Sequence, residues 1–456
     1  MKIIIVGLGD AGSTLVKHLA EEKYDVTVID SNKVLVDRIT DNYNVNGVVG
    51  SGASKDTLMK AGADTADAII ALTHIDEINL LSCMQAKSLG TRRAAARILM
   101  PDFVGEAERL KTEYSIDYFV KPKLDIAEEI YRNIGLSGFI KLEGFFGNEV
   151  QMIDLSVNEN SPLAGRKLME VKHDITDDIT ICSVMRDDKL YVPDGSFEIQ
   201  VNDSLGVVTD KAKITETLEK LGIEQHCCKN IVIVGGGITT EYLLAMLKND
   251  RKKITVYDNN IDRCRNLMEK YPYVDVSYAE GDVTEVLEEE SLEKTDVLIS
   301  LADSDVTNLV VSMFGWAQDI KSVITRVDKT SHVKLLHKVN MDITVSPTEL
   351  SVLKMLRFVR NYEIGDEQEN GVGKFYKIAY GLAEVMEFTA TDGFARLNVE
   401  FKENSFKLKK DVIVAAIIRD SKLIIPTGTT QILKGDTVIV ATSKKNHIRN
   451  LNEILV

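Results

Sequence analysis

Residues 3–12 read IIIVGLGDAG, and residues 231–240 read IVIVGGGITT. In both stretches an apolar run of strand length leads directly into closely spaced glycines, and a run with helical spacing follows the first of them. A continuous apolar run is typical of a strand that is covered on both faces of a parallel sheet. The two stretches lie 228 residues apart in a chain of 456 residues, which indicates a duplication.

The duplication continues beyond these two turns. Asp30 recurs as Asp258, again 228 residues later. Four residues recur at an offset of 229, and they are Asp67, Asp76, Asn79 and Arg97, matched by Asp296, Asp305, Asn308 and Arg326. Farther along, Arg186 and Asp203 recur as Arg419 and Asp436 at an offset of 233. Offsets that differ by so little indicate loop changes within one repeated fold.

Each copy first alternates short apolar runs with helical stretches, which predicts a doubly wound parallel sheet. The runs are 3–6, 26–29, 47–49, 68–72, 95–99 and 118–120, then 231–234, 254–257, 274–278, 297–301, 322–326 and 343–345. The rest of each copy carries short β-rich runs between turns, which predicts a small second lobe. These runs are 150–157, 180–185, 189–192 and 204–208, then 396–401, 412–418, 423–425 and 437–441, with hairpin turns at 186–189 and 419–422.

The predicted fold class is therefore α/β, with two tandem Rossmann-like doubly wound parallel-sheet domains. Each is followed by a small β-rich α+β C-terminal lobe. The predicted boundaries are 1–135 for the first Rossmann-like lobe, 136–213 for its small lobe, 214–228 for a linker, 229–360 for the second Rossmann-like lobe and 361–456 for the last small lobe.

Composition excludes several classes of protein. The net charge of −15 argues against nonspecific nucleic-acid binding as the main role. The five cysteines show no disulfide framework and no CxxC spacing, which favours a reducing compartment. No apolar run approaches the roughly 20 residues that a membrane-spanning helix needs. We therefore expect a cytoplasmic protein that could still dock on a membrane protein.

The first glycine turn has the spacing of a dinucleotide-binding fingerprint. Gly7 would make the tight turn, Gly9 would let the backbone approach a pyrophosphate, and Gly12 would let the helix pack closely on the sheet. The remaining residues of the predicted phosphate-binding turn are Leu8, Asp10 and Ala11. Asp30 ends the second strand, where its carboxylate can accept hydrogen bonds from ribose hydroxyls and would repel a 2′-phosphate. This favours NAD(H) or adenine nucleotides over the NADP form, with a merely tight turn as the alternative.

The second glycine turn departs from this pattern. Gly235 and Gly237 are kept, but Thr240 replaces the third glycine and should push the helix slightly away from the sheet. Asp258 retains the option of binding a ribose. The second crevice is thus either a nucleotide site or a degenerate structural pocket.

Loops after the next strands supply further candidates, because the carboxyl ends of parallel strands lie at the same edge of a sheet. Ser51 and Gly52 follow the third strand, and Asp282 lies in the matching loop of the second copy. These residues can contact a base or ribose, or they can simply form local turns. Thr73 follows the fourth strand and precedes Asp76, which is favourable to the dipole of the helix that begins there.

A guanidinium in an apolar strand needs a partner, and each copy has one. Arg97 and Arg326 lie in otherwise apolar predicted strands. A pyrophosphate is one candidate partner, and an internal salt bridge is the other.

The groups that would carry out a reaction are missing from these motifs. A dehydrogenase needs a proton donor or acceptor beside the nicotinamide. The seven histidines do not recur between the copies, and His74, near the predicted pocket, is matched by Asp303. The stretch 226–228, His-Cys-Cys, could bind a soft metal, but its connector offers no further ligands nearby. We therefore predict no catalytic residues, no metal site and a protein that is not an enzyme.

In this order and duplication, the motifs resemble the cytoplasmic regulatory subunits of Trk-type potassium uptake systems, the TrkA family of tandem RCK proteins. The resemblance covers nearly the whole chain. It rests on the two glycine turns, Asp30 and Asp258, the loop 50–53, the stretch 73–79, residues 96–98, and Ser346-Pro347 followed by a helix that reaches 356–358.

The resemblance implies a homo-oligomer, a tetrameric ring, on the inner face of the cell membrane beneath a TrkH-like potassium channel or transporter. NAD(H) and/or ATP/ADP would be regulatory ligands, held by Gly7, Gly9, Gly12, Asp30 and Arg97. The helices after Pro122 and Pro347 are candidates for the crossover that passes lobe movement to a neighbour. An NAD-dependent oxidoreductase with a duplicated cofactor domain, or a nucleotide-sensing subunit of another cation transporter, is the alternative.

Overall fold

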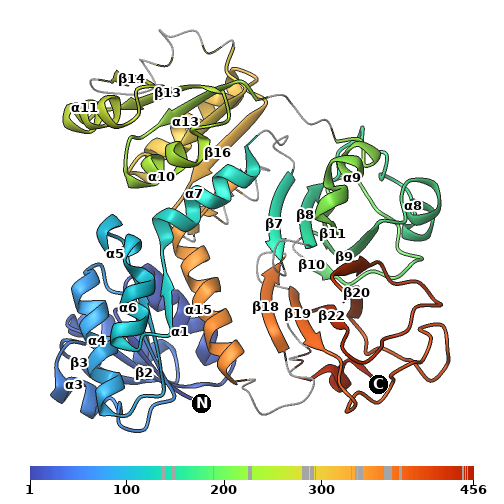
Figure 1. Cartoon of the computed structure of the whole chain (residues 1–456), viewed down its shortest axis with the longest axis horizontal. Helices are drawn as coiled ribbons and strands as arrows, with labels where there is room; N and C mark the ends of the chain where they lie inside the picture. The colour runs from blue at the N-terminus through green and yellow to red at the C-terminus, as the bar shows by residue number, and fades with distance from the viewer. Residues whose placement is uncertain are drawn as a thin grey trace. The chain divides into compact units, whose positions relative to one another are not determined.

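The computed structural model describes residues 1–134, 140–145, 150–187, 189–223, 228–279, 287, 292, 294–329, 331–333, 336, 343–363, 372–378, 383–443, 446, 448 and 450–456. They form two compact units, and each unit draws on both halves of the chain (Figure 1). Unit 1 contains Met1–Tyr131 and Lys229–Val359, and unit 2 contains Arg132–Cys228 and Arg360–Val456. Each unit therefore pairs equivalent parts of the duplication.

The first lobe of unit 1 is a parallel sheet with the strand order β3-β2-β1-β4-β5-β6 in the described part of the chain. Its strands are β1 (Lys2–Val6), β2 (Asp25–Asp30), β3 (Asn46–Val49), β4 (Ala68–Ala71), β5 (Arg93–Arg97) and β6 (Tyr118–Val120). Its helices are α1 (Asp10–Glu21), α2 (Lys33–Asn42), α3 (Lys55–Lys60), α4 (Asp76–Leu89), α5 (Pro101–Gly105), α6 (Ala107–Tyr114) and α7 (Pro122–Asn133). The strand order reverses between β1 and β4, which places a crevice at their carboxyl ends.

The second lobe of unit 1 repeats this topology, with the described strands in the order β14-β13-β12-β15-β16-β17. The strands are β12 (Asn230–Val234), β13 (Lys253–Asp258), β14 (Asp275–Tyr278), β15 (Val297–Ser300), β16 (Ser322–Arg326) and β17 (Ile343–Val345). The helices include α10 (Ile238–Leu247), α11 (Ile261–Lys270), α13 (Asp305–Ala317) and α15 (Pro347–Glu363). A crevice at the carboxyl ends of β12 and β15 follows from the same reversal.

One predicted strand ends earlier than expected. The apolar run 95–99 was predicted as a strand, whereas β5 ends at Arg97. The backbone N–H groups of Leu99 and Met100 donate to the carboxylate of Asp76 at 2.8 and 2.7 Å. This carboxylate takes the donors that a longer strand would offer to the sheet, and the chain leaves the sheet there.

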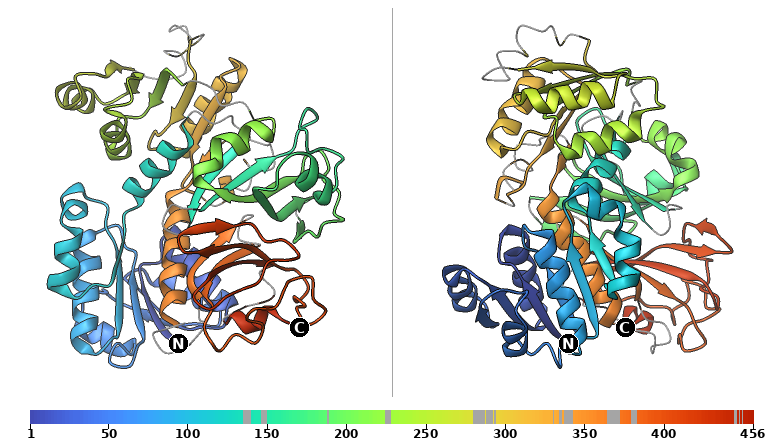
Figure 2. Two further views of the ribbon diagram at one scale, coloured as in Figure 1. Left: turned by 45° about the vertical axis from the view of Figure 1, so that its right-hand side comes forward. Right: turned by 60° about the vertical axis from the view of Figure 1, so that its left-hand side comes forward.

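Helix α15 follows the second sheet but completes the core of the first lobe. Its residues Val352, Met355, Leu356 and Val359 are buried in one cluster with side chains of β1, β2 and α1. Phe358 stacks on Tyr118 of β6, with ring centroids 5.9 Å apart. Figures 1 and 2 show α15, in orange, running alongside the blue first lobe. At about 1.5–3 kcal/mol for each buried large aliphatic side chain, this contact is a major stabilising term for the lobe.

Helix α7 makes the complementary crossing, from the first lobe toward the second (Figure 1). Burial, together with a hydrogen bond to Asp250 of the second lobe, raises the pKa of the Tyr131 phenol near the end of α7. Asp125 of α7 also forms an ion pair with Lys354 of α15, at 2.6 Å between Oδ1 and Nζ. The two helices thus tie the lobes of unit 1 to each other in both directions.

Unit 2 contains two antiparallel sheets of equivalent order in its described part, β10-β9-β11-β8-β7 and β21-β20-β22-β19-β18. The strands of the first are β7 (Ile140–Phe145), β8 (Val150–Ser156), β9 (Ile179–Arg186), β10 (Lys189–Tyr191) and β11 (Ser204–Asp210), accompanied by α8 (Leu168–Asp174) and α9 (Ile214–Lys220). The strands of the second are β18 (Val372–Ile378), β19 (Ala383–Thr389), β20 (Val412–Arg419), β21 (Lys422–Ile424) and β22 (Thr437–Ser443). Buried residues of both sheets share one core cluster, for example Met152 and Cys182 with Val385 and Ala416.

The recurring arginine and aspartate of the small lobes form duplicated ion pairs. Arg186 donates two hydrogen bonds to Asp203 at 2.7 Å each, and Arg419 donates two to Asp436 at 2.8 Å each. Both carboxylates are fully or almost fully buried. Arg186 and Arg419 end β9 and β20, and the two aspartates directly precede β11 and β22, so each pair ties the end of one strand to the start of its neighbour in the sheet.

The predicted fold class is confirmed by these four sheets. One predicted strand, 396–401, is wrong, because this segment consists of turns and a single bridge between Glu400 and Gln431. The stretch predicted as a linker contains α9, whose Leu218 is buried in the core of the first small lobe. The predicted lobe boundaries stay a prediction.

Because α15 completes the first lobe, the Leu356→Ala substitution should destabilise strands more than 300 positions away in the sequence. We expect a loss of about 2–5 kcal/mol, the usual range for truncating a fully buried leucine. Hydrogen–deuterium exchange should report it as faster exchange of the β1 and β2 amides. Val34→Ala, on an exposed position of α2, is the control and should change little. Faster exchange confined to the second lobe would contradict the assignment of α15 to the first.

Candidate nucleotide-binding sites

The first glycine turn has the geometry that its sequence requires. Gly7 has φ +93°, and a Cβ there would lie 2.9 Å from the backbone nitrogen of Thr73. A Cβ at Gly12 would lie only 1.9 Å from the carbonyl oxygen of Gly7, so that the first turn of α1 rests directly against the glycine loop. Among the described residues, no side chain caps the start of α1 at Gly9. Its first N–H groups are therefore open to an anion.

Asp30 and Asp258 hold the glycine turns from the ends of β2 and β13. Asp30 accepts hydrogen bonds from the N–H of Leu8 at 2.7 Å and of Asn32 at 2.8 Å. Asp258 accepts equivalent bonds from residues 236 and 260, at 2.6 and 2.7 Å. Each carboxylate thus positions the glycine loop through its backbone contacts, a role that sequence reasoning missed.

Arg97 is a buried cation without a carboxylate partner in the described part of the chain. Its Nη2 donates to the carbonyl oxygens of Leu72 at 2.6 Å and Thr73 at 2.9 Å, while its Nε has no hydrogen-bond partner among the residues that the structure describes. The side chain is 9% exposed. Burial lowers the pKa of Arg97, and the charge of Asp76 offsets part of this effect. Of the two alternatives from the sequence, the internal salt bridge is not formed with any carboxylate in the described ranges of the chain.

The recurring asparagine and aspartate of each copy secure the loops around the crevice. Asn79 accepts from the N–H of Thr73 at 2.8 Å and donates to the carbonyl oxygens of Thr73 and Arg97 at 3.0 and 2.9 Å. Asn308 makes the same three contacts in the second lobe. Because Asn79 and Asp76 are almost completely buried, their recurrence is explained by the fold.

The second crevice differs from the first in its third glycine position. The threonine there, Thr240, is fully buried, and its hydroxyl donates to the carbonyl oxygen of Gly235. In the first copy, a side chain at Gly12 would collide with the carbonyl oxygen of Gly7. In the second copy, Thr240 instead forms a hydrogen bond with the equivalent carbonyl oxygen. No side chain among the described residues caps α10 at Gly237, so the start of this helix is also open.

The arginine of the second crevice is already neutralised. Arg326 donates to both oxygens of Asp328, at 3.1 and 2.8 Å. The internal salt bridge is therefore the correct alternative for Arg326. The sequence could have shown this pair, because Asp328 follows Arg326 by two residues at the end of a strand. Side chains two residues apart in an extended segment project to the same side.

A second group of charges surrounds Asp258, which is 4% exposed. Arg263 lies 3.6 Å from Asp258 and 3.0 Å from Asp303. The charges of Asp303 and Arg263 also act on Lys123, which comes from α7 of the first half. Burial lowers the pKa of Lys123, and the charge of Arg326 lowers it further. Sequence reasoning missed Lys123, because no motif places α7 beside the other lobe.

The remaining candidates are placed as follows. Ser51 is exposed, and the backbone of Gly52 rests on β1, where a Cβ would lie 2.2 Å from Cγ1 of Val6. Asp282 lies outside the described residues, as do positions 226 and 227. In the described part of the chain, no cluster of three or more acidic, histidine or cysteine side chains could hold a metal. There, too, no helix combines the length and the apolar character needed to cross a bilayer.

The contacts of Asp305 predict an acid-sensitive loop in the second lobe. Burial by itself would raise the pKa of Asp305, but the N–H groups of Asp328 and Lys329 and the imidazole of His332 hold it below its ordinary value. Because this pKa is lower in the folded protein, the Asp305 carboxylate stabilises the fold at pH values above its pKa in the unfolded chain. This stabilisation is lost as the pH falls through its pKa in the folded protein. Asp305→Asn should therefore flatten the fall of Tm between about pH 5 and about pH 3. Asp262→Asn, at an exposed position, should keep the wild-type slope, and equal slopes for all three proteins would contradict this role.

Comparison with known proteins agrees with this architecture. A model of the TrkA-N domain matches residues 3–122 and 231–347, and a model of the TrkA-C domain matches residues 152–222 and 399–455. The Trk system potassium uptake protein TrkA homolog 2 of Methanosarcina mazei is 28% identical over 448 residues, which cover 96% of this chain and 97% of that one. The Trk system potassium uptake protein TrkA of Haemophilus influenzae is 26% identical over 459 residues, covering 100% of this chain and 98% of that one.

Solved structures share the fold. The crystal structure of the GsuK RCK domain has a TM-score of 0.62 at 17% identity and covers 97% of this chain and 92% of that one. The GsuK channel bound to NAD has the same TM-score and identity, with 97% and 77% covered. The TrkA-N matches alone extend over more than half of the residues, once in each copy, and the chain belongs to the TrkA family.

Proposed function

We propose that this chain is the nucleotide-binding regulatory subunit of a Trk-type potassium uptake system. The observation that carries this proposal is Arg97, a buried guanidinium whose Nε has no hydrogen-bond partner among the described residues. Arg97 donates to the carbonyl oxygen of Thr73, and Thr73 in turn borders Gly7 of the glycine turn before α1. A buried cation is stabilised by an anion, and a pyrophosphate at the helix start would supply one. Relatives of full length are named as Trk potassium uptake proteins, and one similar structure is a channel bound to NAD.

In the first crevice, NAD(H) or an adenine nucleotide lies with its phosphates over the glycine turn. Gly7 and Gly9 leave room for the phosphates, and Gly12 keeps α1 close enough for its N–H groups to reach them. Asp30 accepts hydrogen bonds from the ribose with the lone pairs that its backbone contacts leave free. The other residues assigned to this site are Leu8, Asp10, Ala11, Ser51, Gly52 and Thr73.

The second crevice takes a nucleotide more weakly or takes a different one. Gly235 and Gly237 present the same open helix start, and Asp258 is placed for a ribose, with Asp282 in the neighbouring loop as a further candidate. The arginine of this crevice already has a carboxylate partner, so that a phosphate would gain less from it. The two crevices are therefore unequal in their affinity for polyphosphate ligands.

Nucleotide binding is linked to the membrane partner through the crossing helices. A ligand moves an equilibrium only as far as it binds one conformation more tightly than the other. Shifting a gate from mostly closed to mostly open takes about 5.5 kcal/mol of differential binding. Because α15 begins in one lobe and is buried in the other, a change in either crevice is transmitted along a rigid element.

The functional assembly is a homo-oligomeric ring, a tetramer, beneath a TrkH-like membrane subunit on the cytoplasmic face. Helix α13 carries an exposed apolar face at Val306, Val310 and Met313, spaced by four and three residues so that they share one side. The equivalent helix α4 exposes Leu81 at the position that matches Val310. Such a face is suited to pack on another copy of the chain.

In this scheme the nucleotide is a regulatory ligand, and the protein catalyses no reaction on it. His74 lies beside Gly9, at 3.4 Å from where a Cβ would be, but the matching residue of the second crevice is Asp303. The proposed sites thus share their glycine turns, whereas His74 has no histidine counterpart in the second copy.

The two arginines provide a matched test of the function. Arg97→Gln should weaken NADH or ATP binding at the first site by about tenfold to a hundredfold, because it removes a charge-assisted contact. Arg326→Gln should leave nucleotide binding at the second site almost unchanged, since the charge of Arg326 is already paired with Asp328. Titration calorimetry on the full chain measures both. In cells that depend on this uptake system, only the first variant should impair potassium uptake, and an equal effect of the two would contradict the proposed role of Arg97.

The proposed assembly surface, the apolar face of α13, can be tested by introducing a charged side chain into it. Val310→Asp should reduce the molecular mass measured by light scattering after gel filtration, because it places a carboxylate in the centre of the apolar face of α13. Val34→Asp, at a more exposed site on α2, is the control and should leave the mass unchanged. If Val310→Asp keeps the wild-type mass, the copies meet through another surface.

A further inference from the structure

The two small lobes of unit 2 carry opposite charges, although they share one fold. Residues 163–222 of the first contain eight lysine and arginine residues and twelve acidic ones, whereas residues 396–455 of the second contain eleven and six. The second small lobe is therefore positive within a chain whose net charge is −15. Such an asymmetry between two copies of one lobe indicates that their surfaces meet different surroundings.

The clearest difference lies in the segment just before β20. Lys407 and Lys410 stand 233 residues after Asp174 and Asp177, so two carboxylates of the first small lobe are matched by two ammonium groups in the second. Lys409 adds a third positive charge between them. Because the first small lobe folds with acidic side chains at the matching positions, the shared fold gives no reason for lysines in the second.

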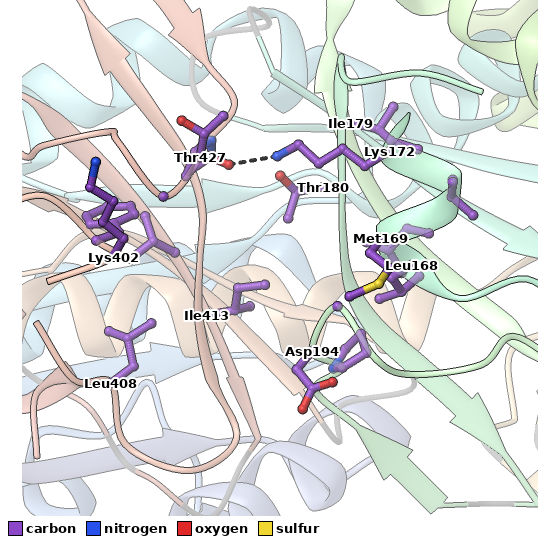
Figure 3. A pocket seen from close by; sticks show the side chains of 18 of the residues that line it. Leu168, Met169, Lys172, Ile179, Thr180, Asp194, Lys402, Leu408, Ile413 and Thr427 are labelled. Carbon is purple, nitrogen blue, oxygen red and sulfur yellow. Dashed lines mark hydrogen bonds between the residues drawn. The ribbon is translucent and has the colours of Figure 1, made fainter. Parts of the chain in front are cut away.

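The backbone directs these side chains outward. The N–H of Lys409 donates to the carbonyl oxygen of Ile454 at 2.8 Å, and Leu408 forms a bridge with Leu455, so the segment is extended and held to the rest of the lobe. The side chain of Leu408 packs against the core of the lobe and lines a pocket inside unit 2 (Figure 3). Successive side chains of an extended segment alternate, so Lys407 and Lys409 project away from that core.

We define Lys407, Lys409 and Lys410 as the lysine patch, and its charges are not used within the described part of the chain. All three residues are exposed, and none forms an ion pair with a carboxylate in the described ranges. Lys402, in contrast, is paired with Glu400 at 2.8 Å between Nζ and Oε2. The patch thus offers three ammonium groups whose only counterions would come from outside the lobe.

The type of side chain favours one kind of anionic partner. Protein interfaces are enriched in arginine and depleted in lysine. The arginines of this lobe in the described ranges serve its own structure, since Arg396 donates to the carbonyl oxygen of Ser405 at 2.7 Å and Arg419 pairs with Asp436. Lysine is a mobile point charge without the planar fork of arginine, which suits a surface of diffuse negative charge better than a specific polar contact.

Nucleic acid fits the lobe less well than a lipid surface does. Proteins that bind single strands present aromatic rings on which bases stack. In the described part of 383–456, every aromatic ring is buried or half-buried, and these rings belong to Phe388, Phe394, Phe401 and Phe406.

We propose that the lysine patch contacts the anionic lipid headgroups of a membrane surface. Basic side chains are attracted to an anionic leaflet, and this attraction falls off within a Debye length of about 10 Å. The rest of the chain is acidic and is repelled by the same surface, so the patch would turn the second small lobe toward the lipid. This contact goes beyond the proposed regulation, because it requires neither a nucleotide nor a membrane protein.

Co-sedimentation of the full-length protein with lipid vesicles tests the proposal. Vesicles of equimolar phosphatidylglycerol and phosphatidylcholine, without any membrane protein, should bind the chain in low salt, and vesicles of phosphatidylcholine alone should not. Because each lysine near an anionic surface strengthens binding by about fivefold, the combined Lys407→Gln, Lys409→Gln and Lys410→Gln variant should bind about a hundredfold more weakly. Equal binding to both kinds of vesicle, no binding to either, or wild-type binding by the triple variant would each overturn the proposal.

Two further triple variants separate the patch from net charge. Lys17→Gln, Lys55→Gln and Lys60→Gln together remove the same charge from exposed positions of the first lobe of unit 1 and should bind the vesicles like the wild type. Replacing the three lysines of the patch by arginine keeps their charge and should also preserve binding. The proposal fails if the first of these variants loses as much binding as the glutamine variant of the patch, or if the arginine variant does.

Two additions to the same assay separate this proposal from other partners and from the proposed function. Duplex DNA, added at the same concentration of phosphate as the lipid, should displace little protein from the vesicles, and displacement of most of it would favour nucleic acid and overturn the lipid contact. Arg97→Gln, designed to weaken nucleotide binding, should bind the vesicles like the wild type, so that either proposal can fail while the other holds.

Discussion

The burial of α15 in the core of the first lobe is the contact on which the rest of unit 1 depends. A parallel sheet needs helices on both faces, and here one of the covering elements comes from the other half of the chain. Val352, Met355, Leu356 and Val359 would face water if the halves separated. Helix α7 reaches in the opposite direction, and its Asp125 pairs with Lys354 of α15. The lobes are consequently parts of a single folding unit, in which neither can shift without disturbing the other.

The two crevices share a backbone and differ in a few side chains that decide their electrostatics. In the first, Arg97 is held by carbonyl oxygens, which orient a guanidinium but do not neutralise it. In the second, Asp328 neutralises Arg326. A single residue pair thus distinguishes the two copies: the charge of Arg326 has a carboxylate partner, and that of Arg97 has none among the described residues. The duplicated hydrogen bonds of Asn79 and Asn308, in contrast, keep the loop geometry the same in both.

The fold could be predicted from the sequence because apolar periodicity and glycine spacing are local properties of the chain. The duplication also allowed each prediction to be compared with a second copy. The strand predicted at 396–401 was wrong, since alternation alone does not separate a strand from a turn-rich segment that packs Phe401 on Phe406. At the site, the glycines and Asp30 were recognisable from spacing. Two features were not recognisable, because they depend on contacts between distant parts of the chain. They are the lack of a carboxylate partner for Arg97 in the described ranges and the effect of second-lobe charges on Lys123.

Lys123 belongs to the first copy by sequence, but its charge acts on the second copy, where Arg326 and Asp303 lie in its electrostatic environment. After the duplication, the two copies were therefore not free to diverge independently. A change at any of these three positions alters the energetic effect of a change at the others, so their substitutions are not additive. Mutational scans that treat each half as a separate gene product would miss this epistasis.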